Sequence, residues 1–239
     1  MNLIFKIFLF CLIAYNCFSK EDSLSNSKIE LMIEEYLLKN PEVIIKSLEN
    51  YRSKQEAKME ENSKISLNNY YEERVYENLP YTGNTSGKIV ITEFIDYNCG
   101  YCKKTLNIII ELLSKNNDIK VVFVDFPILS ETSYVAAQGA LAAFEQNAYF
   151  KFHSELLKGN RDFSEAYILE IAENLKLDTT KFIKDMKSNF VSEKLKANIK
   201  FARELNIRGT PSFIIDKKIY PGAYELVKLE EIIKNNKKK

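Results

Sequence analysis

The fold is decided by the stretch Glu93-Phe94-Ile95-Asp96-Tyr97-Asn98-Cys99-Gly100-Tyr101-Cys102, in which strand-forming residues lead into a pair of cysteines. Residues 88–95 are mostly β-branched or aromatic and are apolar on both faces, a pattern that predicts a central, buried strand. Residues 99–114 carry apolar side chains three to four positions apart, which predicts a helix. The two cysteines are therefore expected at the turn where a strand passes into a helix.

A second buried strand is predicted for residues 120–126, shortly after this helix. Together the three elements make a strand, helix, strand unit, whose strands should be parallel and whose connection should be right-handed. Open α/β folds place their reactive groups at the carboxyl edge of such strands. The cysteine pair is expected at that edge.

The remainder of the main domain, predicted for residues 79–239, is a helical insertion followed by a return to strands. Apolar stripes at helical spacing run through the insertion, at about residues 130–190, and a further helix is expected for residues 192–206. Residues 212–215 predict a strand that opens a hairpin, and residues 224–234 predict a closing helix. The expected fold class is α/β.

An N-terminal helical arm is predicted for residues 20–78. Pro41 is typical of the first turn of a second helix within it. Residues 52–69 are nearly all polar, so the arm is not expected to bury much surface against the domain along its whole length. Two interpretations stay open: a helix that packs on the domain, and a stalk through which the protein forms oligomers.

Residues 1–19 are typical of a secretory signal peptide. A lysine precedes an apolar run at residues 7–15, and Cys17 and Ser19 supply small side chains for cleavage after Ser19. The run is shorter than the roughly 20 apolar residues that a membrane-spanning helix needs. We therefore expect export to the periplasm, with a membrane-anchored form as the less favoured alternative.

The cysteines point to redox chemistry. The chain has four of them, and Cys11 and Cys17 belong to the leader, so the exported chain would keep only Cys99 and Cys102. A disulfide stabilises a fold chiefly by closing a long loop of the unfolded chain. A bond between two cysteines three positions apart closes a very short loop, so the pair is better explained by redox function than by architecture.

Their spacing places both sulfurs on one face of the helix, close enough for a Cys99–Cys102 disulfide. The unpaired amides and the macrodipole of a helix N-terminus favour a thiolate at Cys99, which makes Cys99 the expected nucleophile and Cys102 the buried resolving cysteine. A zinc site would need two more ligands, and haem attachment would need a histidine in place of Lys103. No metal and no cofactor is expected.

Composition excludes several other classes of protein. Hydrophobic residues make up 46% of the 239 residues, which indicates a globular protein with a real core. The 34 basic residues nearly cancel the 33 acidic ones, so no strong positive field is available to attract nucleic acid. We expect no nucleic-acid partner.

Several motifs together resemble the thioredoxin superfamily, and specifically its DsbA-like branch of exported bacterial thiol-disulfide oxidoreductases. The motifs are the stretch 93–102, Phe126-Pro127-Ile128-Leu129, Arg208-Gly209-Thr210-Pro211-Ser212-Phe213 and Pro221-Gly222-Ala223. The resemblance implies a thioredoxin fold with a helical insertion. It also implies that Pro211 is cis and lies against the cysteines, and that the Thr210 backbone binds a substrate segment, with Gly100 and Tyr101 beside it.

Glu93 lies in the middle of the predicted central strand, where an unpaired carboxylate is costly to bury. The resemblance implies that this acid relays protons to and from the inner cysteine, whereas a salt bridge to a lysine or a solvated gap is the alternative. Tyr97 and Tyr101 are expected to frame the site and offer apolar surface to the substrate. The single histidine, His153, is expected to be a partly buried helix residue without a catalytic role.

The resemblance leaves the direction of the reaction open. Gly100-Tyr101 replaces the Pro-His pair of the strong oxidants, and together with Thr210 it looks more like the disulfide isomerases. The arm resembles the N-terminal extension of ScsC-type members, which mediates oligomerisation. The expected partners are unfolded or partly folded exported proteins, a membrane redox partner that recycles the cysteine pair, and a possible second copy of this chain.

The alternative function is that of a chaperone or scaffold protein. Such a protein would bind its clients through the arm and an apolar groove, while its disulfide stays inert. The oxidoreductase requires both cysteines, whereas the scaffold would suppress aggregation without them.

Overall fold

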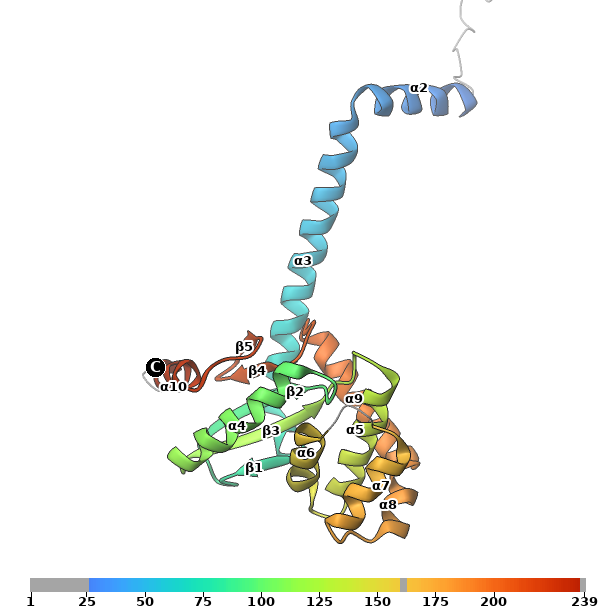
Figure 1. Ribbon diagram of the computed structural model, residues 1–239. Coiled ribbons are helices and arrows are strands. Elements are labelled where there is room, and N and C mark those ends of the chain that lie inside the picture. The colour runs from blue at the N-terminus through green and yellow to red at the C-terminus, as the bar shows by residue number, and fades with distance from the viewer. Residues whose placement is uncertain (1–25, 160–162, 237–239) are drawn as a thin grey trace, which may run out of the picture. The chain divides into compact units, whose positions relative to one another are not determined.

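The computed structural model describes residues 26–159 and 163–236, so the predicted signal peptide lies outside the described residues. The strands of the described residues form one mixed sheet, in the order β1-β3-β2-β4-β5 (Figure 1). They are β1 (Tyr81–Gly83), β2 (Ile89–Ile95), β3 (Ile119–Asp125), β4 (Ser212–Ile215) and β5 (Lys218–Pro221).

The centre of the sheet is the predicted strand, helix, strand unit. β2 pairs in parallel with β3 and antiparallel with β4, and α4 (Gly100–Lys115) connects β2 to β3. All of β3 and most of β2 are buried, as their apolar runs predict. The structure therefore confirms the α/β class and the thioredoxin-like order of elements.

The strand β1 was not predicted, because it is only three residues long and lies beside a segment rich in turn residues. It pairs antiparallel with β3, through Tyr81 and Val122 at one end and Gly83 and Lys120 at the other. Gly83 adopts a φ of 87°, and a Cβ there would come within 2.6 Å of the Ile119 carbonyl oxygen. The glycine thus permits the edge strand to approach β3.

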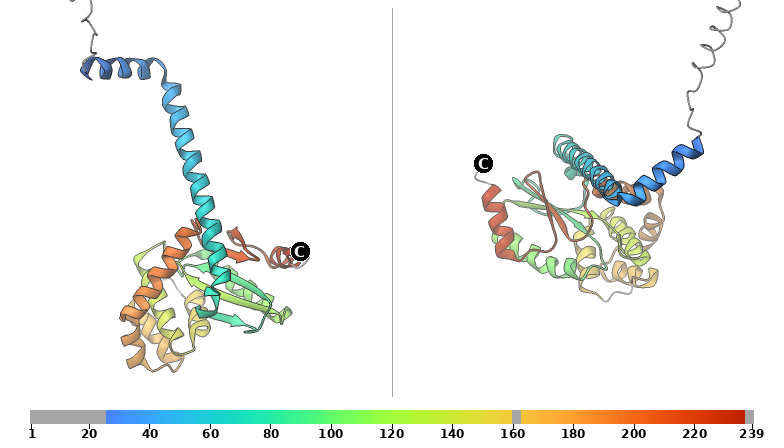
Figure 2. Two further views of the ribbon diagram at one scale, coloured as in Figure 1. Left: turned by 180° about the vertical axis from the view of Figure 1, so that it is seen from behind. Right: turned by 90° about the horizontal axis from the view of Figure 1, so that it is seen from above.

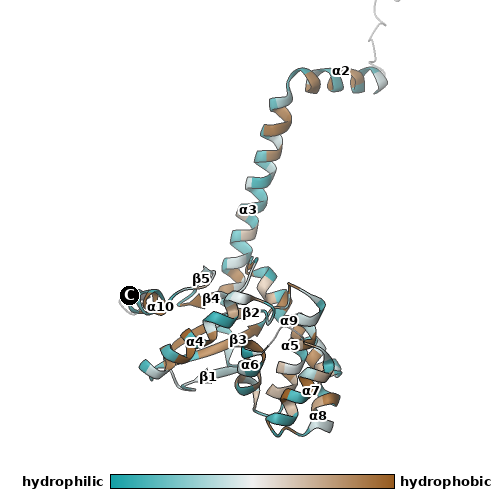
Figure 3. Ribbon diagram, viewed as in Figure 1, coloured by the Kyte–Doolittle hydropathy of each residue, from teal (hydrophilic) through white to brown (hydrophobic). Residues whose placement is uncertain are grey.

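Helices cover both faces of the sheet, and the side chains of β2 alternate between them. Phe94 points toward α9 (Asn189–Glu204), where its ring lies 5.7 Å from that of Phe201. Glu93 points toward the opposite face, where α4 and α10 (Leu226–Asn236) lie next to each other (Figure 2). Figure 3 shows the apolar character of the strands that these helices cover.

The helical insertion follows β3. It consists of α5 (Glu131–Phe144), α6 (Tyr149–Lys158), α7 (Glu165–Asn174) and α8 (Thr179–Met186), and α9 leads back to the sheet. Four of these helices have a serine or aspartate N-cap that accepts a backbone N–H, namely Ser130, Ser164, Asp178 and Ser188. These caps satisfy amides that would otherwise lack partners.

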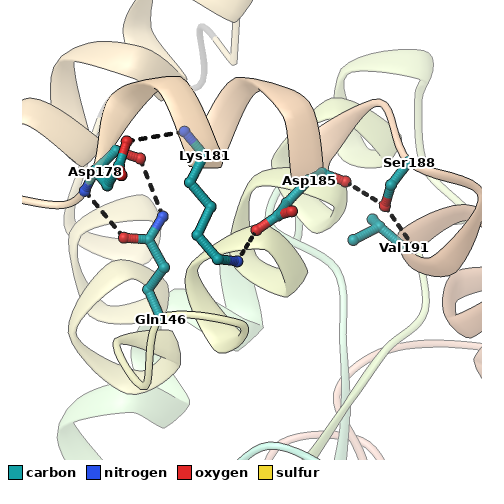
Figure 4. A network of polar contacts seen from close by, with 6 residues as sticks. All are labelled: Gln146, Asp178, Lys181, Asp185, Ser188 and Val191. Atoms are coloured by element: carbon teal, nitrogen blue, oxygen red, sulfur yellow. Dashed lines mark hydrogen bonds and ion pairs between the residues drawn. The ribbon is translucent and has the colours of Figure 1, made fainter.

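Polar contacts join α8 to the turn after α5 (Figure 4). Gln146 donates to the Asp178 carbonyl oxygen at 3.1 Å and accepts from the Asp178 N–H at 2.9 Å. Lys181 forms an ion pair with Asp185, whose carbonyl oxygen accepts from Ser188 at 2.7 Å. Hydrogen bonds between the ends of its helices therefore hold the insertion together, in addition to the packing of its apolar stripes.

The N-terminal helices are α2 (Asn26–Lys39) and α3 (Pro41–Glu72), followed by the short helix η1 (Val75–Asn78). The chain divides into two units between Glu56 and Ala57, inside α3, whereas the arm was expected to extend to residue 78. No residue is buried among those described in the first unit, residues 26–56. No helix of the described residues is both long and apolar enough to cross a membrane.

The C-terminal turns of α3 belong to the second unit and are anchored to its sheet. Tyr70 is 1% exposed, its hydroxyl lies 2.5 Å from that of Thr92 on β2, and its ring stacks on Phe201 at 4.9 Å. Ser63 donates to the Leu205 carbonyl oxygen at 3.1 Å. This part of α3 packs on the domain although the sequence before Tyr70 is largely polar.

Candidate active site

The two cysteines lie in the first turn of α4. Cys99 is the N-cap residue with an extended backbone, and its sulfur accepts a hydrogen bond from the Cys102 N–H at 3.4 Å. The helix begins at Gly100, one residue later than predicted. Both cysteines are free thiols, so the structure presents the reduced form of the expected Cys99–Cys102 pair.

The surroundings of Cys99 favour its thiolate. They lower the pKa of the Cys99 thiol to about 5, first through a hydrogen bond from the Cys102 side chain and then through Thr210 and the N–H groups of Cys102 and Tyr101. Partial burial opposes this shift, because a charged sulfur is less stable away from water. The hydrogen bonds outweigh burial, and they provide the low pKa that an attacking sulfur requires.

Cys102 has the opposite character. Its side chain is 0% exposed, and burial is the main reason that its pKa is raised far above the usual range. Its hydrogen bond to Cys99 and the charge of Glu93 raise the pKa further. Cys99 keeps 6% of its surface exposed, so a substrate can reach only one member of the pair.

Glu93 lies on the same side of β2 as the cysteines and is 2% exposed. Its neighbours across the sheet are Phe123 on β3 and Phe213 on β4. Burial raises the pKa of the Glu93 carboxyl to about 8, and the charge of Cys99 adds to the effect. Both causes favour the protonated form of the Glu93 carboxyl. No lysine contributes to the shift, so the alternative of a salt bridge between Glu93 and a lysine has no support here.

The Thr210–Pro211 peptide bond is cis and lies beside Cys99. The Cys99 thiol donates to the Thr210 carbonyl oxygen at 3.1 Å. The Thr210 hydroxyl is buried, without a hydrogen-bond partner in the described part of the chain. A Cys99 thiolate would give this hydroxyl an acceptor, in agreement with the contribution of Thr210 to the low pKa of Cys99.

A cavity of about 400 Å³ opens next to the cis-proline loop. It is lined by residues 206–212 and, from the hairpin side, by Ile219, Pro221 and Gly222. Gly222 adopts a φ of 93° and donates its N–H to the Pro211 carbonyl oxygen at 2.9 Å. The cavity offers apolar surface and backbone groups along the cis-proline loop, whose Thr210 carbonyl oxygen contacts Cys99.

The two tyrosines expected to frame the site differ. Tyr101 follows Gly100 in the first turn of α4 and is 63% exposed, so it is available to a substrate. Tyr97 is 1% exposed, and its hydroxyl donates to Asp125 at 3.0 Å. The expectation that Tyr97 offers surface to the substrate is therefore wrong, because its side chain turns into the core.

Asp96 is a structural member of the site that the sequence analysis missed. It is 1% exposed, and its carboxylate accepts from the N–H groups of Asn98, Ile128 and Leu129 at 2.8–2.9 Å and from the Ser133 hydroxyl at 2.7 Å. An aspartate at the end of a strand typically accepts a hydrogen bond from the backbone N–H two residues later, as Asp96 does from Asn98. No sequence pattern indicates that Ile128, Leu129 and Ser133, which follow β3, are its other partners.

His153 lies on α6 and is 1% exposed, so it is more deeply buried than predicted. Burial lowers the pKa of its imidazole to about 3. Its ring lies 4.6 Å from that of Phe123, and its Nδ1 atom is 3.3 Å from the Tyr97 hydroxyl. The described residues contain no group of three or more His, Cys, Asp or Glu side chains able to hold a metal ion.

Comparison with known proteins adds to this geometry. A family model described as thioredoxin matches residues 76–235, which include the cysteine pair, Glu93 and the cis-proline. The chain belongs to the thioredoxin family. A second model, described as the copper resistance protein ScsC N-terminal domain, matches residues 27–58 of the arm.

Solved structures agree with this assignment. The thiol-disulfide exchange protein α-DsbA2 of Wolbachia pipientis is 30% identical, with a TM-score of 0.67 over 74% of this chain and 96% of that one. A thioredoxin-like oxidoreductase of Silicibacter pomeroyi is 33% identical, with a TM-score of 0.65 over 68% of this chain and 94% of that one. The chain is thus a DsbA- and ScsC-like member of the family, as the sequence motifs indicated.

Curated relatives include much longer proteins. The Na(+)/H(+) antiporter NhaA 3 of Salinispora tropica is 26% identical over 153 residues, which are 63% of this chain and 24% of the antiporter. The chain therefore spans about a quarter of the length of the first such relatives.

Proposed function

We propose that this protein is an exported thiol-disulfide oxidoreductase that forms or isomerises disulfide bonds in other exported proteins. The observation that carries the proposal is the asymmetry of the pair: Cys99 is the reachable sulfur with a pKa of about 5, and Cys102 is buried with a pKa far above its usual range. Such asymmetry is what thiol-disulfide exchange requires, because one sulfur must attack or leave as a thiolate while the other stays in reserve.

In the oxidising direction, a substrate thiolate attacks Cys99 of the Cys99–Cys102 disulfide. The bond between Cys99 and the substrate forms as Cys102 leaves and takes up a proton. A second substrate thiolate then displaces Cys99, so the substrate gains a disulfide while the pair gains two electrons. In the isomerising direction, the Cys99 thiolate attacks a wrong disulfide of the substrate and is later displaced by another thiol of that substrate.

The substrate is held beside Cys99 by the cis-proline loop. The Thr210 carbonyl oxygen lies 3.1 Å from the Cys99 sulfur, so an extended segment that bonds to this backbone would bring its own cysteine within reach of Cys99. Gly100 and Tyr101 form the other side, where Tyr101 is exposed. We infer that the partners are unfolded or partly folded exported proteins, and that a membrane redox protein recycles the pair in the periplasm.

The test is the reduction potential of the pair, measured by equilibrating the mature protein in glutathione buffers and counting free thiols by a mass-tagging gel shift. A potential near about −120 mV would indicate a donor of disulfides, and one of about −180 to −270 mV would favour isomerase or reductant work. A pair that stays oxidised in excess reduced glutathione would contradict the proposal and favour the scaffold.

We also propose that the arm joins copies of this chain. In residues 26–56 many large apolar side chains are exposed, and helices of a soluble protein seldom leave such side chains uncovered. They are Ile29, Leu31, Met32, Ile33, Tyr36 and Leu38 of α2 and Val43, Ile44, Ile45, Leu48 and Tyr51 of α3.

Charged substitutions in the arm are expected to reduce the oligomer to a monomer. Leu31→Glu combined with Leu48→Glu places carboxylates among the exposed apolar side chains, where burial between chains would be costly. The mass in solution is measured by light scattering after size-exclusion chromatography. Val227→Glu, at an exposed position of α10, is the matched control. A monomeric parent chain would contradict the expectation.

A further inference from the structure

Each of the three residues before Cys99 is held by its side chain. The carboxylate of Asp96 binds the loop after β3, and the Asn98 amide donates to the Ser130, Thr132 and Ser133 hydroxyls at 2.8–3.0 Å. The Cys99 N–H closes the turn by donating to the Asp96 carbonyl oxygen at 3.0 Å. Asp96 and Asn98 thus tie the turn to the loop after β3 and to the start of α5, whereas the Tyr97 side chain ties its inner side to Asp125.

The Tyr97 hydroxyl donates to a buried acid, Asp125. Asp125 is the last residue of β3, is 0% exposed, and lies across from Ile95 in the parallel pairing with β2. Its Oδ1 atom accepts from the Tyr97 hydroxyl at 3.0 Å and from the Tyr149 hydroxyl at 2.9 Å. Its Oδ2 atom is buried without a partner in the described part of the chain.

The cluster around Asp125 has little charge to balance a carboxylate. Tyr97, Tyr149 and His153 are all buried, and the nearest cation that affects Asp125 is Lys194 on α9, which is itself half-buried. Burial raises the pKa of the Asp125 carboxyl to about 7, although both tyrosines lower it. A buried acid with an unpaired oxygen is costly to keep, and the reaction described above does not use it.

We propose that Asp125 is a positioning residue for Cys99: it holds the Tyr97 hydroxyl, and Tyr97 fixes the turn that sets the Cys99 sulfur against the Cys102 N–H and Thr210. The inference rests on the proposed function and deepens it. The Cys99 sulfur lies 3.4 Å from the Cys102 nitrogen and 3.1 Å from the Thr210 carbonyl oxygen, so a displacement of the turn changes both contacts at once. Loosening the inner side of the turn moves the sulfur away from the donors that stabilise its thiolate.

The test follows alkylation of reduced Cys99 by iodoacetamide between pH 3 and 9, with mass spectrometry to locate the label. Tyr97→Phe removes one hydroxyl and keeps the ring, and we expect the Cys99 titration to move up by about one pH unit, a fall of about fivefold in alkylation rate at pH 5. Asp125→Asn should shift the titration in the same direction. The double variant should shift it no further than Tyr97→Phe alone, because both changes break one contact.

Tyr149→Phe is the matched control, because Tyr149 donates to the same oxygen from α6 and does not belong to the turn. It removes the 3.3 Å contact between the Tyr97 and Tyr149 hydroxyls and leaves the 3.0 Å bond from Tyr97 to Asp125 in place. We expect it to reduce stability toward urea and to leave the Cys99 titration in place. Equal shifts for Tyr97→Phe and Tyr149→Phe, or an unchanged titration in a folded Tyr97→Phe variant, would overturn the inference. A parent chain whose Cys99 titrates near pH 9 would instead refute the proposed function, so the two failures are distinguishable.

Discussion

Cys99→Ser is expected to abolish thiol-disulfide exchange, and Cys102→Ser is expected to trap a covalent complex between Cys99 and the substrate. Cys99 is the only sulfur of the pair with exposed surface and a lowered pKa, and a serine hydroxyl neither ionises in this range nor forms a disulfide. Loss of a catalytic nucleophile typically lowers turnover by more than about a thousandfold. Turnover is measured by reactivation of a scrambled, disulfide-containing enzyme.

The Cys102→Ser variant should behave differently from Cys99→Ser because the first attack stays possible. Its reduced Cys99 can open a substrate disulfide, but the buried partner that would release the substrate is missing, so a mixed disulfide accumulates on a non-reducing gel. Circular dichroism checks that both variants fold. A Cys99→Ser chain that turns over like its parent would refute the mechanism.

The double variant, Cys99→Ser with Cys102→Ser, separates the oxidoreductase from the scaffold. It keeps the exposed arm of residues 26–56 and the cavity beside Pro211. If it still suppresses aggregation of a reduced client protein as well as the parent does, client binding is the main activity and the thiols are dispensable. We expect protection to fall to that of an inert protein.

The strand-to-helix setting of the cysteines could be predicted because its signals are local. An apolar run predicts β2, helical spacing predicts α4, and the position of Cys99 at the N-terminus of this helix follows from these two elements. The place of Glu93 in the middle of the central strand also follows, but the sequence left open whether its carboxyl is buried, paired with a lysine or solvated, and the structure shows it 2% exposed. The structure adds the distances and the physical causes of each pKa shift.

The support of the site could not be predicted, because its contacts join residues far apart in the chain. Nothing near Asp125 in the sequence indicates that Tyr97 and Tyr149 donate to one of its oxygens, 28 and 24 positions away. The anchoring of α3 is similar, since Tyr70 meets Thr92 and Phe201 only after the sheet and α9 have formed. Such contacts depend on tertiary packing and leave no periodic pattern.

Glu93→Gln is expected to slow the step in which Cys102 acts, by about a hundredfold, as loss of a general acid or base typically does. Cys102 is buried with a strongly raised pKa, so it needs a base before it can attack the mixed disulfide at Cys99. The charge of the Cys99 thiolate helps to raise the pKa of Glu93, and this charge disappears when Cys99 is bound to substrate. The pKa of Glu93 therefore falls when the mixed disulfide forms, so a larger fraction of the carboxyl is ionised and able to accept the proton that Cys102 must lose.

The same substitution should raise stability at alkaline pH, and this sign tests whether the fold holds the Glu93 carboxyl in its protonated form. The pKa of Glu93 in the folded chain is about 8, above its ordinary value of 4.5, so its favourable contribution is complete below pH 4.5 and is lost as the pH rises toward 8. Glutamine does not titrate. Relative to the parent, the variant should gain up to about 1.4 kcal/mol per pH unit across this window.

The measurement is urea unfolding of the reduced protein at pH 5 and pH 8, together with the rate at which Cys102 resolves a mixed disulfide at Cys99. Glu111→Gln, at an exposed position of α4 where Glu111 pairs with Lys115, is the matched control and should change neither quantity appreciably. A Glu93→Gln chain that resolves the mixed disulfide at the parent rate would exclude the relay. One that is less stable at pH 8 would show that the carboxyl is ionised and paired in the fold, because only an ionised group loses stabilising contacts when its charge is removed.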